Sequence, residues 1–224
     1  MTRKTANYWL AVSAILIAAS VILFLLPVSS RKDRKPYDLR ESLSFQDTIL
    51  VVTDIIDGDT FVLSESIQVR LIGVDTPEKG QPFFHEARAY AESVLSGSSV
   101  RLEYDEELLD NYGRRLAYLF IDTSLFNANI VRNGLASVYL FPRNNRFASR
   151  FIEAQKQARR DRIGIWSLDD PSPEEYYVGI PGSLRFHRPL CPHLKKSDPA
   201  NLLRYSSRRE PLDLGLSSCR FCRP

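Results

Sequence analysis

Acidic and basic side chains that could act on a phosphate occur in three segments of the sequence. Residues 57–60 read DGDT, Arg70 is followed by the acids Asp75 and Glu78, and a second arginine is Arg114. Carboxylates held close together repel one another unless a cation lies between them, and such a cation attracts phosphate. Arginine guanidiniums donate to phosphate oxygens in pairs. Acids for a hard divalent cation and arginines for a phosphate together indicate metal-assisted cleavage of phosphodiesters, which is nuclease chemistry.

Each acid also has an ordinary interpretation. Asp57 precedes a glycine in a predicted turn, where aspartate usually serves the turn itself, so we expect a structural role for it. Asp59 stands at the entrance to a strand, where an acid is unfavourable, and Asp75 is expected nearby in the same sheet. A paired-acid metal site explains both residues better. Glu78, in a loop stiffened by a proline, is by itself typical of a solvated loop acid.

The elements that must position these residues are predicted to be short strands and a few helices. Alternating β-branched and apolar residues predict strands at 48–56, 60–63, 67–74, 100–104 and 116–121. In the third strand Ile67, Val69 and Leu71 fall on one face, and Arg70 and Ile72 fall on the other. Helices are predicted at 81–96, 125–133 and 146–162, each ending at or near a glycine. This order predicts a mainly β protein with helices (α+β), built on a small closed five-stranded barrel.

Several separated motifs occur in an order typical of a known family. They are DGDT at 57–60, RLIGVDTPE at 70–78, YGRRLAY at 112–118, the segment 127–136 and IWS at 165–167. Over roughly 49–166 the chain resembles the thermonuclease (staphylococcal nuclease-like) family. The resemblance implies an OB-fold domain, which we place at 48–167. It also implies a calcium site in which Asp59 and Asp75 give carboxylates and Thr76 gives its backbone carbonyl.

The same resemblance implies roles for the other candidate site residues. Glu78 would be the general base that positions or deprotonates the attacking water. Arg70 and Arg114 would contact the scissile phosphate, with Arg114 at the leaving oxygen. Tyr112 and Tyr139 match positions that contact the substrate nucleotide.

The predicted substrate contacts depart in part from the family pattern. Phe141 stands where the family often has a second tyrosine, so a stacking face remains but its hydroxyl is lost. Asn111 stands in place of a lysine, and the loop 79–82 is short. The residues predicted to cleave the substrate are all present.

The N-terminal segment has the features of a membrane span. Residues 8–28 are uncharged and rich in Leu, Ile, Val and Ala, and about twenty apolar residues match the thickness of a bilayer core. We predict a transmembrane helix at 8–28 and a linker at 29–47. Basic residues after the span favour a cytoplasmic domain, but such leaders usually serve export. We expect a single-pass membrane protein with its catalytic domain outside, or a secreted protein after cleavage of a signal peptide.

A second group of metal-ligating residues lies near the C-terminus, beyond an acidic, proline-containing linker at 168–184. His187, Cys191, Cys219 and Cys222 form two ligand pairs that suit a closed tetrahedral zinc site. His193 is a rival ligand, and a Cys219–Cys222 disulfide is the main alternative. The module at 185–224 resembles the metal-binding domain of the Ada DNA-repair protein. Its zinc would be structural, because so short a segment buries little core.

Composition agrees with these predictions without adding specificity. The chain has 224 residues, a net charge of +3 and 44% hydrophobic residues, which excludes a disordered or an entirely membrane-embedded protein. We therefore expect a membrane-anchored, calcium-dependent nuclease that cleaves DNA or RNA with little sequence preference and leaves 3′-phosphate ends. The alternatives are an inactive nucleic-acid-binding OB module and a membrane scaffold built around the zinc module. The sequence predicts no protein partner.

Overall fold

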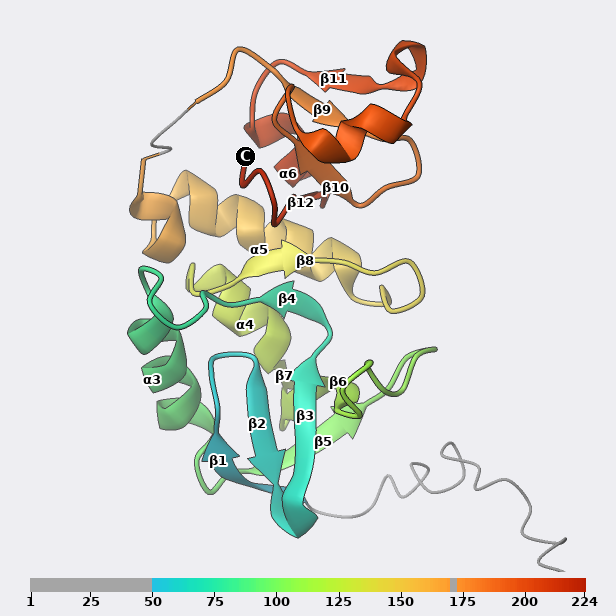
Figure 1. Cartoon of the computed structure of the whole chain (residues 1–224). Coiled ribbons are helices and arrows are strands. Elements are labelled where there is room, and N and C mark those ends of the chain that lie inside the picture. The colour runs from blue at the N-terminus through green and yellow to red at the C-terminus, as the bar shows by residue number, and fades with distance from the viewer. Residues whose placement is uncertain (1–49, 170–172) are drawn as a thin grey trace, which may run out of the picture. The chain divides into compact units, whose positions relative to one another are not determined.

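The computed structural model describes residues 50–169 and 173–224, which belong to one compact unit, Gln46–Pro224 (Figure 1). The predicted transmembrane helix at 8–28 and the linker at 29–47 lie outside the described residues. Within the described ranges, no helix combines the length and the apolar character needed to cross a membrane.

Five strands close into a barrel of the OB type, which confirms the predicted architecture. β1 pairs antiparallel with β2 and β5, β2 with β3, and β5 with β6, while β3 runs parallel to β6 and closes the barrel. Closure leaves few unpaired strand edges. The strands are β1 (Leu50–Ile55), β2 (Thr60–Leu63), β3 (Ile67–Leu71), β5 (Ser99–Glu103) and β6 (Arg115–Ile121), with the short β7 (Ser124–Leu125) beside β6.

Three helices pack around this barrel and complete its core. They are α3 (Phe84–Leu95), α4 (Phe126–Arg132) and α5 (Ala148–Arg160), and all three lie inside the predicted ranges. Phe61 and Val69 point into the barrel and are fully buried, as are Phe126 of α4 and Phe151 of α5. Burying large apolar side chains of this kind contributes about 1.5–3 kcal/mol each. The core therefore holds the strands in the register that the site requires.

The strand predicted at 67–74 is in fact two strands. β3 stays in the barrel, whereas β4 (Gly73–Asp75) leaves it and pairs antiparallel with β8 (Ser137–Tyr139). Gly73 has a φ of +79°, and a Cβ there would lie 2.5 Å from Cε2 of Phe151. Both the positive φ and the closeness of the Phe151 ring therefore require glycine at position 73. Because the sequence pattern stays apolar across the break, periodicity alone does not reveal it.

Ile72, which was predicted to continue the strand of Arg70, lies between β3 and β4 and is buried. Its amide donates to the carbonyl of Ala117, and its own carbonyl accepts from Nδ2 of Asn127. Asn127 is itself fully buried and also accepts from the amide of Leu119. The side chain of Asn127 thus supplies hydrogen-bond partners for buried backbone groups at the point where the pairing between strands is interrupted.

The C-terminal segment forms a separate small sheet in the order β11-β9-β10-β12. Its elements are β9 (Tyr177–Gly179), β10 (Arg185–His187), β11 (Leu203–Tyr205), β12 (Ser217–Ser218) and α6 (Arg209–Asp213). Short 3-10 helices cover Ser64–Ser66, Gly164–Ser167, Pro192–Lys196 and Pro199–Asn201. β9 lies inside the segment 168–184 that the sequence predicts as a linker, so this sheet begins earlier than expected. We call residues 177–224 the C-terminal module.

The C-terminal module packs against α5 and β8 (Figure 1). Arg159 of α5 pairs with Asp213 at 2.7 Å, and the side chain of Gln155 donates to the carbonyl of Leu212 at 3.3 Å. Gly215 approaches so closely that a Cβ would lie 2.6 Å from Cδ1 of Ile152. These contacts hold the module beside the strand pair β4–β8, which carries Asp75.

Candidate active site and metal centre

The DGDT turn between β1 and β2 places Asp59 in a buried position beside β4. Oδ1 of Asp57 accepts from the amide of Asp59 at 3.0 Å, which is the structural turn role expected for Asp57. Oδ2 of Asp59 accepts from the amide and the hydroxyl of Thr76, at 2.7 and 2.9 Å. Gly58 leaves room for this contact, since a Cβ there would lie 2.8 Å from Cγ2 of Thr76. The turn and β4 therefore meet at Asp59.

Arg70 joins the two aspartates that were predicted as a pair. Its Nη1 lies 2.9 Å from Oδ2 of Asp59, and its Nη2 lies 2.9 Å from Oδ1 of Asp75. Arg70 also donates to the carbonyl of Val74 at 3.0 Å, which fixes the guanidinium against β4. The break after β3 thus allows the guanidinium of Arg70 to contact both carboxylates.

Burial disfavours the charged forms of two aspartates at this position. Burial raises the pKa of Asp75, although the charges of Arg70 and Arg220 act in the opposite direction. Burial, followed by the charge of Asp59, raises the pKa of Asp57 to about 6. Carboxyl groups whose charged forms are disfavoured in this way are stabilised by a bound cation.

The donor atoms at this position suit a hard divalent cation. Asp59 and Asp75 offer carboxylate oxygens from the DGDT turn and the end of β4, and the family resemblance adds the backbone carbonyl of Thr76, the next residue. Calcium binds such oxygens with flexible geometry. Glu78 is exposed in the following loop and lines one hollow of about 460 Å³ with Asp75 and Thr76. The candidate base therefore shares one cleft with two of the three candidate metal ligands, while Asp59 is buried behind them.

Arg114 is held near this site by its own loop. Its Nε donates to Oδ2 of Asp110 at 2.7 Å, and its Nη1 donates to the hydroxyl of Thr60 at 3.4 Å. Burial alone would raise the pKa of Asp110, but hydrogen bonds from Arg114 and Tyr112 and the charge of Arg114 outweigh burial and lower it. Asp110 thus positions Arg114, a role that the sequence did not indicate.

The two candidate substrate tyrosines have different surroundings. Both line a second hollow of about 290 Å³ that also contains Arg70 and Arg114. Tyr112 is 86% exposed, with the guanidinium of Arg114 5.4 Å from its ring centre. Tyr139 is half-buried, and the guanidinium of Arg185 lies 3.7 Å from its ring centre. A base could stack on Tyr112, whereas Arg185 already covers one face of Tyr139.

The C-terminal module contributes two arginines that the sequence did not assign to this site. Arg185 covers Tyr139, and Nη2 of Arg220 lies 2.8 Å from Oδ1 of Asp75. Their contacts cross the interface between the module and the barrel, and no local sequence signal could have found them.

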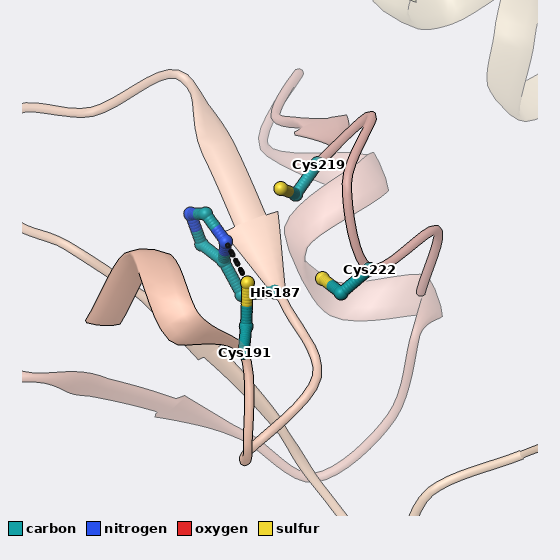
Figure 2. Close-up of side chains that lie close together, drawn as sticks. All are labelled: His187, Cys191, Cys219 and Cys222. Atoms are coloured by element: carbon teal, nitrogen blue, oxygen red, sulfur yellow. Dashed lines mark hydrogen bonds between the residues drawn. The ribbon is translucent and has the colours of Figure 1, made fainter. Parts of the chain in front are cut away.

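The four predicted zinc ligands come together in the C-terminal module (Figure 2). The ligand atoms of His187, Cys191, Cys219 and Cys222 all lie within 4.8 Å of one another, and Nδ1 of His187 is 3.4 Å from Sγ of Cys191. A tetrahedral site with bonds of about 2.3 Å separates neighbouring sulfurs by about 3.8 Å. The three cysteines are free, so the alternative disulfide is not formed. The cluster fits a tetrahedral metal.

The surroundings of the cluster also suit a metal. Burial, followed by the charge of His193, lowers the pKa of His187 and so favours the neutral imidazole that metals bind. Burial, with contributions from the neighbouring cysteines, raises the pKa of Cys222 to about 12. A metal would relieve this cost by stabilising the thiolate. His193 is exposed and stacks on Phe221 instead of joining the cluster.

We predict that replacing Cys191 with serine weakens zinc binding by at least about 100-fold, because one of the four direct ligands is lost. The measurement is zinc content of the purified full chain by mass spectrometry, with affinity from chelator competition. His193→Ala is the matched control and should retain zinc. Equal loss of zinc in His193→Ala and His187→Ala would contradict the proposed ligand set.

A closed barrel that presents paired aspartates, a glutamate and two arginines defines a nuclease-type domain. The family described as "Staphylococcal nuclease homologue" matches residues 68–168. The thermonuclease of Staphylococcus intermedius is 38% identical over 125 residues, covering 52% of this chain and 74% of the relative. The thermonuclease of Staphylococcus hyicus is 32% identical over 162 residues, covering 68% and 95%. Endonuclease YncB of Bacillus subtilis is 31% identical over 123 residues, covering 50% and 58%. The chain belongs to the staphylococcal nuclease family.

Proposed function

We propose that this protein is a calcium-dependent nuclease that hydrolyses phosphodiester bonds of DNA or RNA with little sequence preference. The observation that carries the proposal is the junction at Arg70, which joins Asp59 and Asp75 at 2.9 Å each. Glu78 lines the same hollow as Asp75, and Arg114 lines the same hollow as Arg70. Membership of the staphylococcal nuclease family and the thermonuclease relatives support the same activity.

Each residue of the site has a different role in the proposed reaction. Bound by Asp59, Asp75 and the carbonyl of Thr76, calcium would polarise the phosphate and offset its charge. Glu78, exposed on its loop, accepts a proton from the attacking water or orients it. Arg70 and Arg114 donate to the phosphoryl oxygens as negative charge develops. Arg114 is the donor for the departing 5′-oxygen, so that the phosphate stays on the 3′ side.

Further parts of the proposal concern the ends of the chain. The Cys/His cluster would hold a structural zinc, and its resemblance to the Ada metal-binding domain stays a prediction. A membrane anchor at 8–28, with the domain outside or secreted after cleavage, is likewise a proposal. The barrel domain at 48–167 and the C-terminal module complete the proposed organisation.

The test is cleavage of a labelled single-stranded DNA by the full chain, in calcium and in chelator. We expect calcium-dependent cleavage, and we expect Glu78→Gln to lower its rate about 10²- to 10⁴-fold, the usual contribution of a general base. Glu86→Gln, an exposed acid of α3 outside the hollows, is the matched control and should keep the activity. DNA binding without cleavage in calcium, magnesium or manganese would favour the inactive binding module.

A further inference from the structure

Arg220 extends from the C-terminal module into the nuclease site. It lies between Cys219 and Cys222, and its Nη2 is 2.8 Å from Oδ1 of Asp75, a residue 145 positions earlier in the chain. Its side chain is still 62% exposed. An exposed arginine that reaches a candidate metal ligand in another part of the fold is unusual for a merely solvated charge.

The backbone that carries Arg220 is fixed within the module. The amide of Cys219 donates to the carbonyl of Phe186, and the amide of Arg223 donates back to the carbonyl of Cys219, both at 2.9 Å. Arg188 donates to the carbonyls of Cys222 and Arg223, at 3.0 and 3.1 Å. The two cysteines beside Arg220 belong to the metal cluster. The position of Arg220 is therefore set by the cluster rather than by a free loop.

The position of the guanidinium suits an anion. Arg220 lines the hollow that contains Glu78 and also the hollow that contains Arg70 and Arg114, so it stands where the two meet. Arg70 and Arg220 both contact the same carboxylate oxygen of Asp75. Two cations that share one oxygen repel each other, and a phosphate between them offsets that repulsion.

The guanidinium keeps donors available for a ligand. Among the residues that the structure describes, its hydrogen bond to Asp75 uses Nη2 alone, and the other N–H groups have no protein acceptor. Its charge also lies 4.8 Å from the ring centre of Tyr139, a candidate substrate contact. Asp75 thus orients Arg220 without exhausting its capacity to bind phosphate.

We propose that Arg220 binds a backbone phosphate of the nucleic acid beside the scissile one, so that the C-terminal module forms part of the substrate site. The inference rests on the proposed nuclease function and adds a contact outside the barrel. The metal cluster then has a second consequence, because it positions a substrate-binding arginine as well as holding the module together.

The test measures binding separately from cleavage. The full chain carrying Glu78→Gln is titrated with a fluorescent single-stranded oligonucleotide in calcium, at several salt concentrations. Adding Arg220→Gln should weaken binding about 10-fold, as expected for loss of a charged hydrogen bond. It should also reduce the slope of log affinity against log salt by about 0.7, the value for one phosphate contact on a single strand. Arg220→Lys should restore most of the slope but less of the affinity.

Arg204→Gln is the matched control, because Arg204 is an exposed arginine of the same module that stacks on Tyr176 and lies outside both hollows. It should leave both affinity and slope unchanged. Zinc content and Tm must be equal in the Arg220 and Arg204 variants, which separates a lost contact from a lost fold. With Glu78 intact, Arg220→Gln should raise KM more than it lowers kcat.

Two results would overturn the inference. Unchanged affinity and salt slope in Arg220→Gln would exclude a phosphate contact. Faster cleavage with a lower calcium requirement would show instead that Arg220 competes with the cation for Asp75. The failure of the nuclease proposal is distinguishable, since a chain that binds DNA through Arg220 but never cleaves it rejects that proposal alone.

Discussion

Replacing Arg114 with glutamine should lower kcat for DNA cleavage by about 100- to 1000-fold, the usual cost of removing one donor to a developing charge. The site depends on this guanidinium because Asp110 holds it at 2.7 Å and aims it into the hollow that Arg70 also lines. Glutamine keeps the stem of the side chain as far as Cδ but loses the guanidinium and its charge. The measurement is single-turnover cleavage at saturating calcium and enzyme, which isolates the chemical step.

The matched control for Arg114 is its neighbour in the chain. Arg115 begins β6 and lies outside both hollows, so Arg115→Gln should cleave at nearly the rate of the unsubstituted chain. Both variants should unfold at similar urea concentrations, since both side chains are only partly buried. Equal losses of kcat in the two variants would mean that general positive charge matters and that Arg114 has no specific role.

Asn127→Ala should lower the free energy of unfolding by about 2–4 kcal/mol, because it leaves buried backbone groups without hydrogen-bond partners. The amide of Asn127 is fully buried, donates to the carbonyl of Ile72 at 2.9 Å and accepts from the amide of Leu119 at 2.9 Å. Alanine would leave these backbone groups buried without partners. Urea unfolding followed by circular dichroism gives the value.

Asn129→Ala provides the comparison within the same helix. Asn129 is a residue of α4 whose side chain makes an exposed hydrogen bond to Ser124, and its loss should cost less than about 0.5 kcal/mol. A cost for Asn127→Ala as small as that of Asn129→Ala would show that water or backbone movement compensates at the strand break. Because the break also orients Asp75, Asn127→Ala should raise the calcium concentration needed for activity in the fraction that stays folded.

The barrel and its helices could be predicted because each element carries a local pattern. Val69 and Leu71 alternate with polar residues, Val100 and Leu102 do the same, and all four are buried as the alternation requires. The helices end near glycines with positive φ, such as Gly97. Local periodicity and turn chemistry therefore determine where the elements lie, and five strands of this length can bury their apolar faces by closing.

The features that the sequence did not predict have one physical cause in common. Each depends on contacts between residues that are far apart in the chain. β3 and β4 separate where the ring of Phe151 packs against Gly73, and neither residue reveals this contact alone. β9 is too short for a pattern and is defined by its neighbours β10 and β11. The pairing of Arg220 with Asp75 likewise requires the docked module. The residue types predicted the chemistry of the site. Identifying all of the residues that belong to it required the folded structure.

The separation between Asp75 and Arg220 has a consequence for biosynthesis. A ribosome adds about 5–20 residues per second, so Arg220, 145 positions after Asp75, is made roughly 7–30 s later. During that interval a nascent barrel can already pair Arg70 with both aspartates, but it lacks the arginine of the C-terminal module. The complete constellation of charges around Asp75 therefore forms only after the C-terminal module has been made, well after the barrel strands.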